Sequence, residues 1–259
     1  MKLILESWRR FLKEEVENNN LHIFFDMDGV LVDLATTLAN KININLKSAV
    51  DPHAATHDEH GEILDRGSKS GRKGLRKLKA LVTEVTPEQL EDITIKKDAG
   101  ESRSPEEKAI NNYVYALLGD KTGQIWLDME VAPGAQEMID AAKEKGNIYV
   151  LSSPVGDISV EKKKQWLKNK LPGVEFVDTI FSSKKGEALK NTGLIQRGET
   201  VILIDDRVKY INDFVTGGQA AAREAGRPEE VYKLVQTIHH YPAATPAAVS
   251  KTLVALGEL

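Results

Sequence analysis

The sequence predicts an α/β fold in which helices cover a doubly wound, mostly parallel sheet. Short apolar runs of strand length alternate along the chain with segments of helical periodicity, and each run ends in a polar turn. Strands that alternate with helices form a parallel sheet, and right-handed crossovers bring the carboxyl ends of its strands to one edge. The predicted strands are residues 21–25, 148–151, 179–181 and 201–204.

The first predicted strand ends in two aspartates. Asp26 and Asp28 follow the run Leu21-His22-Ile23-Phe24-Phe25, and Gly29 completes an Asp-x-Asp-Gly turn. Both carboxylates should project at the carboxyl edge of the sheet, where open α/β sheets bind ligands. Such acids can divide the work of phosphoryl transfer between a nucleophile and a proton shuttle, when a cation keeps the nucleophile ionised. The alternative is a metal-free turn in which the aspartates cap backbone N–H groups.

A small helical insertion is predicted after the first strand. Residues 50–71 lack periodicity and are rich in Gly, Ser, Asp and His, which indicates a long loop. Two capping boxes with proline at the first helical position, Thr86-Pro87-Glu88-Gln89 and Ser104-Pro105-Glu106-Glu107, begin two helices. The predicted parts are an N-terminal amphipathic helix (residues 1–20), a core (residues 21–39 and 121–259) and the insertion (residues 40–120).

Two features of the insertion have more than one interpretation. His53, His57 and His60 have a spacing that can ligate a transition metal if the segment is helical, but surface histidines in a polar loop are common. The basic run from Arg66 to Lys79 contains no acid, and it is either a solvated helix face or a surface that attracts an anionic substrate or nucleic acid. It contains no aromatic residue, which argues against binding of single strands.

The three later strands also end in polar residues. Ser152-Ser153 follows the second strand, Lys184-Lys185 the third and Asp205-Asp206 the fourth. At a shared edge these residues would set a hydroxyl, an ammonium and a second acidic pair beside the first pair. Acidic pairs at strand ends also cap helices, but four such endings in one chain favour a metal site. The core helices are predicted over residues 31–46, 135–145, 160–171 and 186–191, and the tail from residue 217 holds one short strand and two helices.

With these four motifs the chain resembles the haloacid dehalogenase (HAD) superfamily of phosphohydrolases. Within it, residues 126–135 and 149–154 look most like the 5'(3')-deoxyribonucleotidases. The likeness covers residues 21–36 and 124–216 and does not extend to residues 40–120. It implies a HAD-like Rossmannoid core, with the helical insertion as a cap between the first and second motifs that closes over the site and selects the substrate.

The resemblance implies a role for each motif. Asp26 would be the nucleophile that becomes an aspartyl-phosphate, and Asp28 would protonate the leaving oxygen and then activate water. Ser152 would supply a hydroxyl, and Lys185 a point charge between nucleophile and phosphate. Lys185 fits the family's spacing better than Lys184. The substrate-binding set would be Ser152, Ser153, Lys185 and Gly29.

The same resemblance implies Mg²⁺ as the cofactor. Mg²⁺ prefers oxygen ligands and keeps several waters, so one or two carboxylates, a carbonyl and the substrate phosphate suffice. The ligands would be the Asp26 carboxylate, the Asp28 backbone carbonyl and the acidic pair. Asp206 is favoured as the direct ligand and Asp205 as its supporting neighbour, and the reverse arrangement stays open.

The composition of the chain argues against several classes of protein and of chemistry. The net charge of −4 gives no global case for nucleic-acid binding. The absence of cysteine excludes disulfides, thiolate zinc sites and cysteine nucleophiles. No apolar run has the length of a membrane span, and residues 1–10 do not form a signal peptide, so we expect a cytoplasmic protein without a membrane partner. The N-terminal segment looks like those of tailed-bacteriophage proteins, which implies the cytoplasm of an infected bacterium.

The sequence therefore predicts a Mg²⁺-dependent phosphomonoester hydrolase, and the resemblance favours a 5'(3')-deoxyribonucleotidase acting on nucleoside monophosphates. The alternatives are a phosphatase on nucleic-acid ends or on another small phosphate ester, and a noncatalytic HAD-like assembly module. Two departures concern base recognition. Leu34 stands where the nucleotidases carry a base-stacking aromatic residue, and Trp126 lies too near the second core strand to serve as the cap aromatic.

Overall fold

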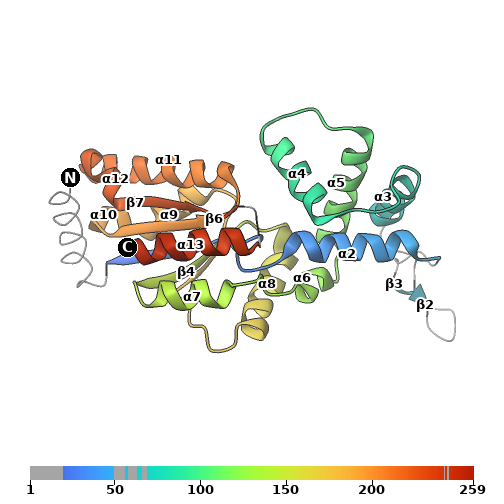
Figure 1. Cartoon of the computed structure of the whole chain (residues 1–259), viewed down its shortest axis with the longest axis horizontal. Coiled ribbons are helices and arrows are strands. Elements are labelled where there is room, and N and C mark those ends of the chain that lie inside the picture. Colours follow the sequence, from blue (N-terminus) through green and yellow to red (C-terminus); the bar gives the residue numbers. More distant parts are fainter. Residues whose placement is uncertain (1–19, 50–55, 58–62, 66–68, 242, 244) are drawn as a thin grey trace. The chain divides into compact units, whose positions relative to one another are not determined.

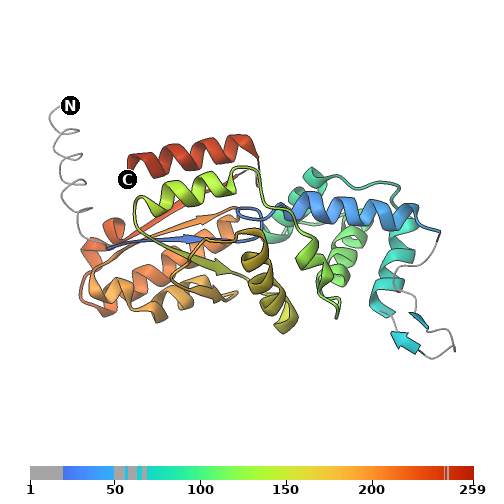
Figure 2. The ribbon, with the colours of Figure 1, turned by 90° about the horizontal axis from the view of Figure 1, so that it is seen from below.

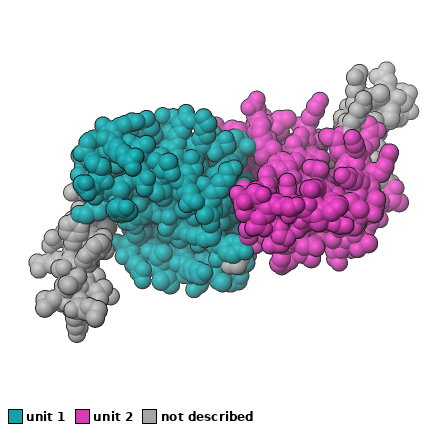
Figure 3. Space-filling view, turned by 90° about the horizontal axis from the view of Figure 1, so that it is seen from above, with its two compact units in different colours: residues 1–33, 131–154, 170–259 teal, residues 34–130, 155–169 magenta. Residues whose placement is uncertain are grey.

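The protein forms two compact units, shown in Figure 1 as a ribbon and coloured separately in Figure 3. Unit 1 comprises residues 1–33, 131–154 and 170–259, and unit 2 comprises residues 34–130 and 155–169. The computed structural model describes residues 20–49, 56–57, 63–65, 69–241, 243 and 245–259. The predicted N-terminal helix lies outside the described residues.

Unit 1 is built on a five-stranded sheet with the order β5-β4-β1-β6-β7. Every neighbouring pair of strands is parallel, which confirms the predicted α/β fold. The chain adds β4 and β5 on one side of β1 and then crosses to place β6 on the other, so the strand order reverses at β1. The strands are β1 (Leu21–Phe25), β4 (Asn147–Ser152), β5 (Thr179–Phe181), β6 (Thr200–Asp205) and β7 (Val235–His239).

Helices cover both faces of this sheet, as Figure 2 shows. The helices α7 (Ala135–Lys143) and α13 (Pro246–Glu258) lie on one face, and α9 (Lys185–Thr192), α10 (Leu194–Arg197) and α11 (Val208–Glu224) lie on the other. The described chain also contains a short 3₁₀ helix (Pro228–Glu230) and α12 (Val231–Leu234) before β7. Phe24, Leu203 and Phe214 belong to the apolar core under α9 and α11.

Unit 2 is helical. Both predicted capping boxes are present: the Thr86 side chain accepts from the Gln89 N–H, and the Ser104 side chain accepts from the Glu107 N–H. Beyond the helices, the described part of this unit contains a short antiparallel strand pair, β2 (Thr56–His57) with β3 (Ile63–Asp65). Its helices are α2 (Leu34–Lys47), α3 (Lys69–Lys79), α4 (Pro87–Asp98), α5 (Pro105–Leu118), α6 (Gln124–Asp128) and most of α8 (Gly156–Lys170).

In this unit the structure differs from what the sequence predicted. The predicted loop over residues 50–71 contains the β2–β3 hairpin and the start of α3, because strands of two and three residues are too short to show an alternating pattern. His57 lies in a strand, so the helical spacing of the three histidines does not apply there; their side chains lie outside the described residues. The predicted boundary between the core and the insertion, at residue 40, falls inside the continuous helix α2. Among the described residues, no helix combines the length and apolar character that crossing a bilayer requires.

Candidate active site

Three acids meet where β1 and β6 end. Asp26 directly follows β1, and its N–H donates to the carbonyl of Ile204 at 2.9 Å, which holds the two strand ends together. Asp205 is the last residue of β6, and Asp206 follows it. Asp26, Asp205 and Asp206 each offer a carboxylate oxygen, and these oxygens lie within 4.8 Å of one another. Because the strand order reverses at β1, this acidic cluster lies where open α/β sheets bind ligands.

Lys185 bridges two of these acids. Its fully buried Nζ lies 2.7 Å from Asp26 Oδ1 and 2.5 Å from Asp205 Oδ2. Burial lowers the pKa of Lys185, but the charges and hydrogen bonds of Asp26 and Asp205 together raise it by more. The net effect is a raised pKa, so the lysine stays protonated. The ring of Tyr210 lies 4.9 Å from the same ammonium. Lys184 is exposed instead, and it pairs with Glu187 at 3.1 Å.

The position of Lys185 depends on a close contact between two helices. A Cβ on Gly186 would lie 2.3 Å from the Asp213 carbonyl and 3.0 Å from Gly217 Cα, so only glycine allows α9 to approach α11 this closely. The Gly186 N–H also donates to Asp213 Oδ2 at 3.0 Å, which satisfies an unpaired donor in the first turn of α9. Because Lys185 begins α9, these contacts fix its backbone beside the acids.

The two acids of the second pair have different hydrogen bonds. Asp205 Oδ2 accepts from Lys185, and Asp205 Oδ1 accepts from the Arg207 N–H at 2.9 Å. Asp206 Oδ1 is buried and has no hydrogen-bond partner among the described residues. Buried carboxylate oxygens are normally satisfied, so an unpaired oxygen in a cluster of acids fits a metal ligand.

The electrostatics of the cluster also fit a divalent cation. Burial raises the pKa of Asp205 to about 6, although Lys185 counteracts this effect. Burial, followed by the charges of Asp205 and Asp26, raises the pKa of Asp206 well above its ordinary value. Lys185 pairs with two of the three carboxylates, so the cluster has excess negative charge when all three are ionised. Oxygen ligands and excess negative charge suit Mg²⁺, which would be held by Asp26 and Asp206 with Asp205 oriented behind them.

The turn after β1 is shaped by glycine. Gly29 has φ +84°, and a Cβ at this position would lie 2.6 Å from Asp206 Oδ2 and 3.2 Å from the Ala243 Cβ. Any other residue would therefore be strained and would displace the Asp206 carboxylate. Asp28 lies in the same turn, which a backbone bridge between Asp28 and Val32 closes.

The serine motif lies at the same edge of the sheet on β4. Ser152 is the last residue of β4 and is completely buried, and its carbonyl accepts from the Ser182 N–H at 3.0 Å. The Ser153 hydroxyl donates to the Ser182 carbonyl at 3.4 Å. The structure thus brings the serines to the carboxyl edge beside β1, the strand that carries Asp26.

One part of the site has no counterpart in the sequence prediction, which assigned no chemistry to the tail. His239 ends β7 opposite Asp205, and its Nε2 lies 3.0 Å from the Asp206 carbonyl oxygen. The His239 ring stacks on Tyr241 with centroids 5.5 Å apart and an interplanar angle of 16°. The sequence signal for this part of the site was a histidine at a strand end. The strand itself lacks the continuous apolar run by which the other strands were recognised, because its sequence is Val235-Gln236-Thr237-Ile238-His239.

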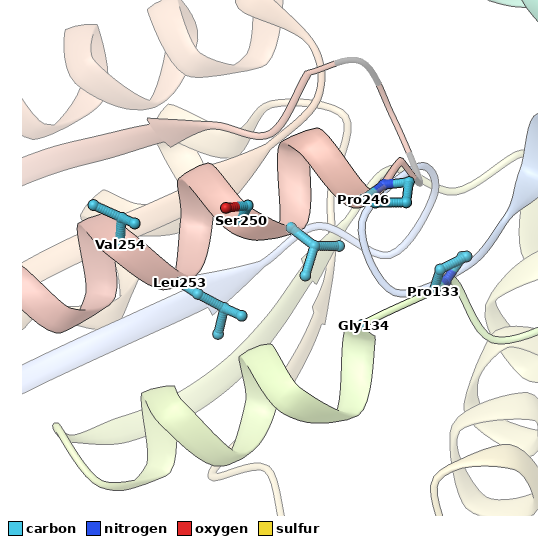
Figure 4. A pocket seen from close by; sticks show the side chains of 7 residues that line it. Pro133, Gly134, Pro246, Ser250, Leu253 and Val254 are labelled. Carbon is cyan, nitrogen blue, oxygen red and sulfur yellow. The ribbon is translucent and has the colours of Figure 1, made fainter.

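A pocket of about 490 Å³ opens elsewhere in unit 1, between the start of α7 and the exposed side of α13, as Figure 4 shows. No acidic or basic side chain lines it, so it offers no group for acid–base or metal chemistry. The acidic cluster is therefore the candidate active site. The labelled lining residues are Pro133, Gly134, Pro246, Ser250, Leu253 and Val254.

No protein-family model matches the sequence, and no curated protein matches it. Solved structures with a similar arrangement include a haloacid dehalogenase-like hydrolase from Burkholderia xenovorans LB400, with 14% identity, 90% of this chain and 98% of that chain covered, and a TM-score of 0.44. A haloacid dehalogenase-like hydrolase from Bacteroides fragilis has 13% identity, coverage of 85% and 97%, and a TM-score of 0.43. A HAD hydrolase from Bacillus subtilis bound to magnesium has 13% identity, coverage of 79% and 84%, and a TM-score of 0.35.

Proposed function

We propose that the protein is a Mg²⁺-dependent phosphomonoester hydrolase that works through an aspartyl-phosphate on Asp26. The observation that carries this proposal is the contact of Lys185 with both Asp26 and Asp205, beside the unpaired Asp206 oxygen. Lys185 pairs with Asp26 through Oδ1 and so orients the carboxylate, which leaves the other oxygen for attack. Bound Mg²⁺ would neutralise the acids and the charge on the phosphoryl oxygens.

The reaction proceeds in two displacements. An Asp26 carboxylate oxygen attacks phosphorus and the bond to the leaving oxygen breaks, while the Asp28 carboxyl gives its proton to that oxygen. Water then attacks the aspartyl-phosphate and gives a proton to Asp28, and phosphate leaves with Asp26 restored. The Lys185 ammonium stabilises the charge on the transferring group in both steps.

A phosphate ester explains this cluster better than a halogenated acid does. A halide departs as an anion without a proton, so that reaction has no use for a proton donor such as Asp28 or for a metal ligand such as Asp206. A phosphate dianion, in contrast, is repelled by the acidic cluster unless a cation offsets the charge. The unpaired Asp206 oxygen therefore supports the phosphatase.

Nucleoside monophosphates are the substrate class that we propose, on the basis of the resemblance to the deoxyribonucleotidases. The stacked rings of His239 and Tyr241 support it, because His239 contacts the Asp206 carbonyl, Tyr241 stacks on His239, and both residues are exposed. A flat aromatic surface beside the phosphate site can stack a base. This pair would take the part of the aromatic residues that positions 34 and 126 do not supply.

A substrate screen tests the proposal. The wild type should hydrolyse p-nitrophenyl phosphate and nucleoside monophosphates with Mg²⁺, lose this activity in EDTA, and release no halide from 2-haloacids. Asp26→Asn should abolish hydrolysis because an amide is not a nucleophile. Asp140→Asn, on the exposed face of α7, is the matched control and should remain active. Activity retained by Asp26→Asn would refute the nucleophile, and halide release would refute the phosphatase.

A further inference from the structure

The helix α3, labelled in Figure 1, belongs to unit 2 and has two chemically different faces. Its apolar side is buried: Leu75 is 3% exposed and Leu78 is 0% exposed. A Cβ on Gly74 would lie 3.2 Å from a ring carbon of Tyr113 in α5, so glycine lets α3 pack closely there. Tyr113 is in turn held by a 2.8 Å hydrogen bond from Asn45 to its hydroxyl. These contacts fix which side of α3 faces outward.

Between residues 72 and 77, the side chains on the outward side of α3 are all cationic. Arg72 and Arg76, and likewise Lys73 and Lys77, are four residues apart and therefore share one face. Lys73, Arg76 and Lys77 are exposed and Arg72 is partly exposed. Within the described residues none of the four side chains makes an ion pair, and α3 itself contains no acid. The group Arg72, Lys73, Arg76 and Lys77 is called the α3 basic face below.

Helix stability does not account for the α3 basic face. Its first turn contains no acid, whereas α4 and α5 both begin with glutamates that favour the helix dipole. Cations at Arg72 and Lys73, in the amino-terminal half, oppose that dipole, whereas Arg76 and Lys77 lie in the last turn and favour it. Like charges four residues apart also repel each other. The two dipole effects oppose each other and the repulsion remains, so the four cations together do not stabilise the free helix, and a bound polyanion would remove their repulsion.

We propose that the α3 basic face binds the phosphodiester backbone of double-stranded nucleic acid without reading its base sequence. Guanidinium groups bind phosphate in bidentate geometry, and the two lysines add point charges. An anionic membrane is disfavoured because Leu75 and Leu78 are buried and the helix has no exposed apolar side chain to insert. Single strands are disfavoured because α3 has no aromatic residue for base stacking. The proposal does not depend on the hydrolase activity.

Fluorescence anisotropy with the full chain tests this proposal. The probe is a labelled 20-base-pair duplex with hydroxyl ends in EDTA, so that neither a terminal phosphate nor a metal engages the acidic cluster. Contact of four cations with phosphates predicts that log K falls with log salt at a slope of about −3.6, or roughly 150-fold weaker binding between 50 and 200 mM salt. Lys73→Gln with Lys77→Gln should reduce the slope by about 2 and weaken binding at least tenfold.

The matched control is Lys164→Gln with Lys168→Gln, an exposed pair four residues apart on α8, which should bind like the wild type. Thermal unfolding checks the fold, and the α3 variant should be about as stable as the wild type, because loss of the Lys73–Lys77 repulsion offsets loss of the favourable Lys77 charge in the last turn. Absence of duplex binding at 50 mM salt, or an equal salt slope for the wild type and the α3 variant, would overturn the proposal. Tighter binding to phosphatidylserine vesicles than to the duplex would overturn it in favour of a membrane.

Discussion

Replacement of Asp206 by asparagine should have opposite effects on stability with and without metal. In the metal-free protein, Asp206 Oδ1 is buried without a partner, and its carboxylate lies within 4.8 Å of two other acids. One such repulsion amounts to about 3 kcal/mol at an effective dielectric constant of 20. Lys185 offsets part of the repulsion in the cluster, so Asp206→Asn should stabilise the metal-free protein by roughly 1–3 kcal/mol. Its Tm should rise by several degrees.

With Mg²⁺ the wild type should instead be more stable than Asp206→Asn. A ligand that binds only the folded state at 100 times its Kd stabilises that state by about 3 kcal/mol. The wild type should gain this stability from Mg²⁺, and Asp206→Asn should gain little because a principal oxygen ligand is lost. Asp205→Asn should instead lower the Tm in EDTA, since Asp205 accepts from both Lys185 and the Arg207 N–H.

Thermal unfolding by circular dichroism, in EDTA and in 10 mM MgCl₂, measures all these differences, and calorimetric titration with Mg²⁺ measures the affinity directly. The reasoning would be refuted if Asp206→Asn lost stability in EDTA and kept the wild-type response to Mg²⁺. If only Asp205→Asn lost the response to Mg²⁺, Asp205 would be the direct ligand.

Two further predictions concern the tail. Tyr241→Ala should lower kcat/KM for a deoxynucleoside monophosphate by roughly 5- to 100-fold, the contribution of one stacked base. It should not change kcat/KM for deoxyribose 5-phosphate, which lacks the base; equal loss on both substrates would contradict base stacking. Burial, and then the charge of His239, lower the pKa of His240 to about 4 in the folded protein. The unfolded chain therefore binds a proton at this histidine below pH 6.5, whereas the folded protein binds it only near pH 4. Urea unfolding should therefore show that the wild type loses about 3 kcal/mol more between pH 7 and pH 4 than His240→Asn does, and equal losses would contradict this account.

The sequence identified the strand ends because the apolar runs that precede them are local and continuous. It favoured Lys185 over Lys184 by spacing alone, and the structure shows a tertiary cause: Gly186 packs against α11 and fixes the first turn of α9. No pattern along the chain reveals that contact. Tyr241 was missed for a related reason, because it follows an edge strand without a clear apolar run and reaches the site only through the pairing of β7 with β6.

Hydrogen bonds, not spacing, distinguish the two acids of the second pair. Asp205 ends β6 and uses both oxygens on protein donors, so a metal ion would compete with Lys185 and the Arg207 N–H for them. Asp206 lies one residue further, against the turn at Gly29, and keeps an oxygen without a partner. Lys185 and a cation would therefore have separate roles: the lysine holds Asp26 and Asp205 together, and the cation would satisfy Asp206. Loss of Lys185 would remove the ammonium partner of Asp26 Oδ1 and Asp205 Oδ2, and a Mg²⁺ ion held by Asp26 and Asp206 would not restore that contact for Asp205.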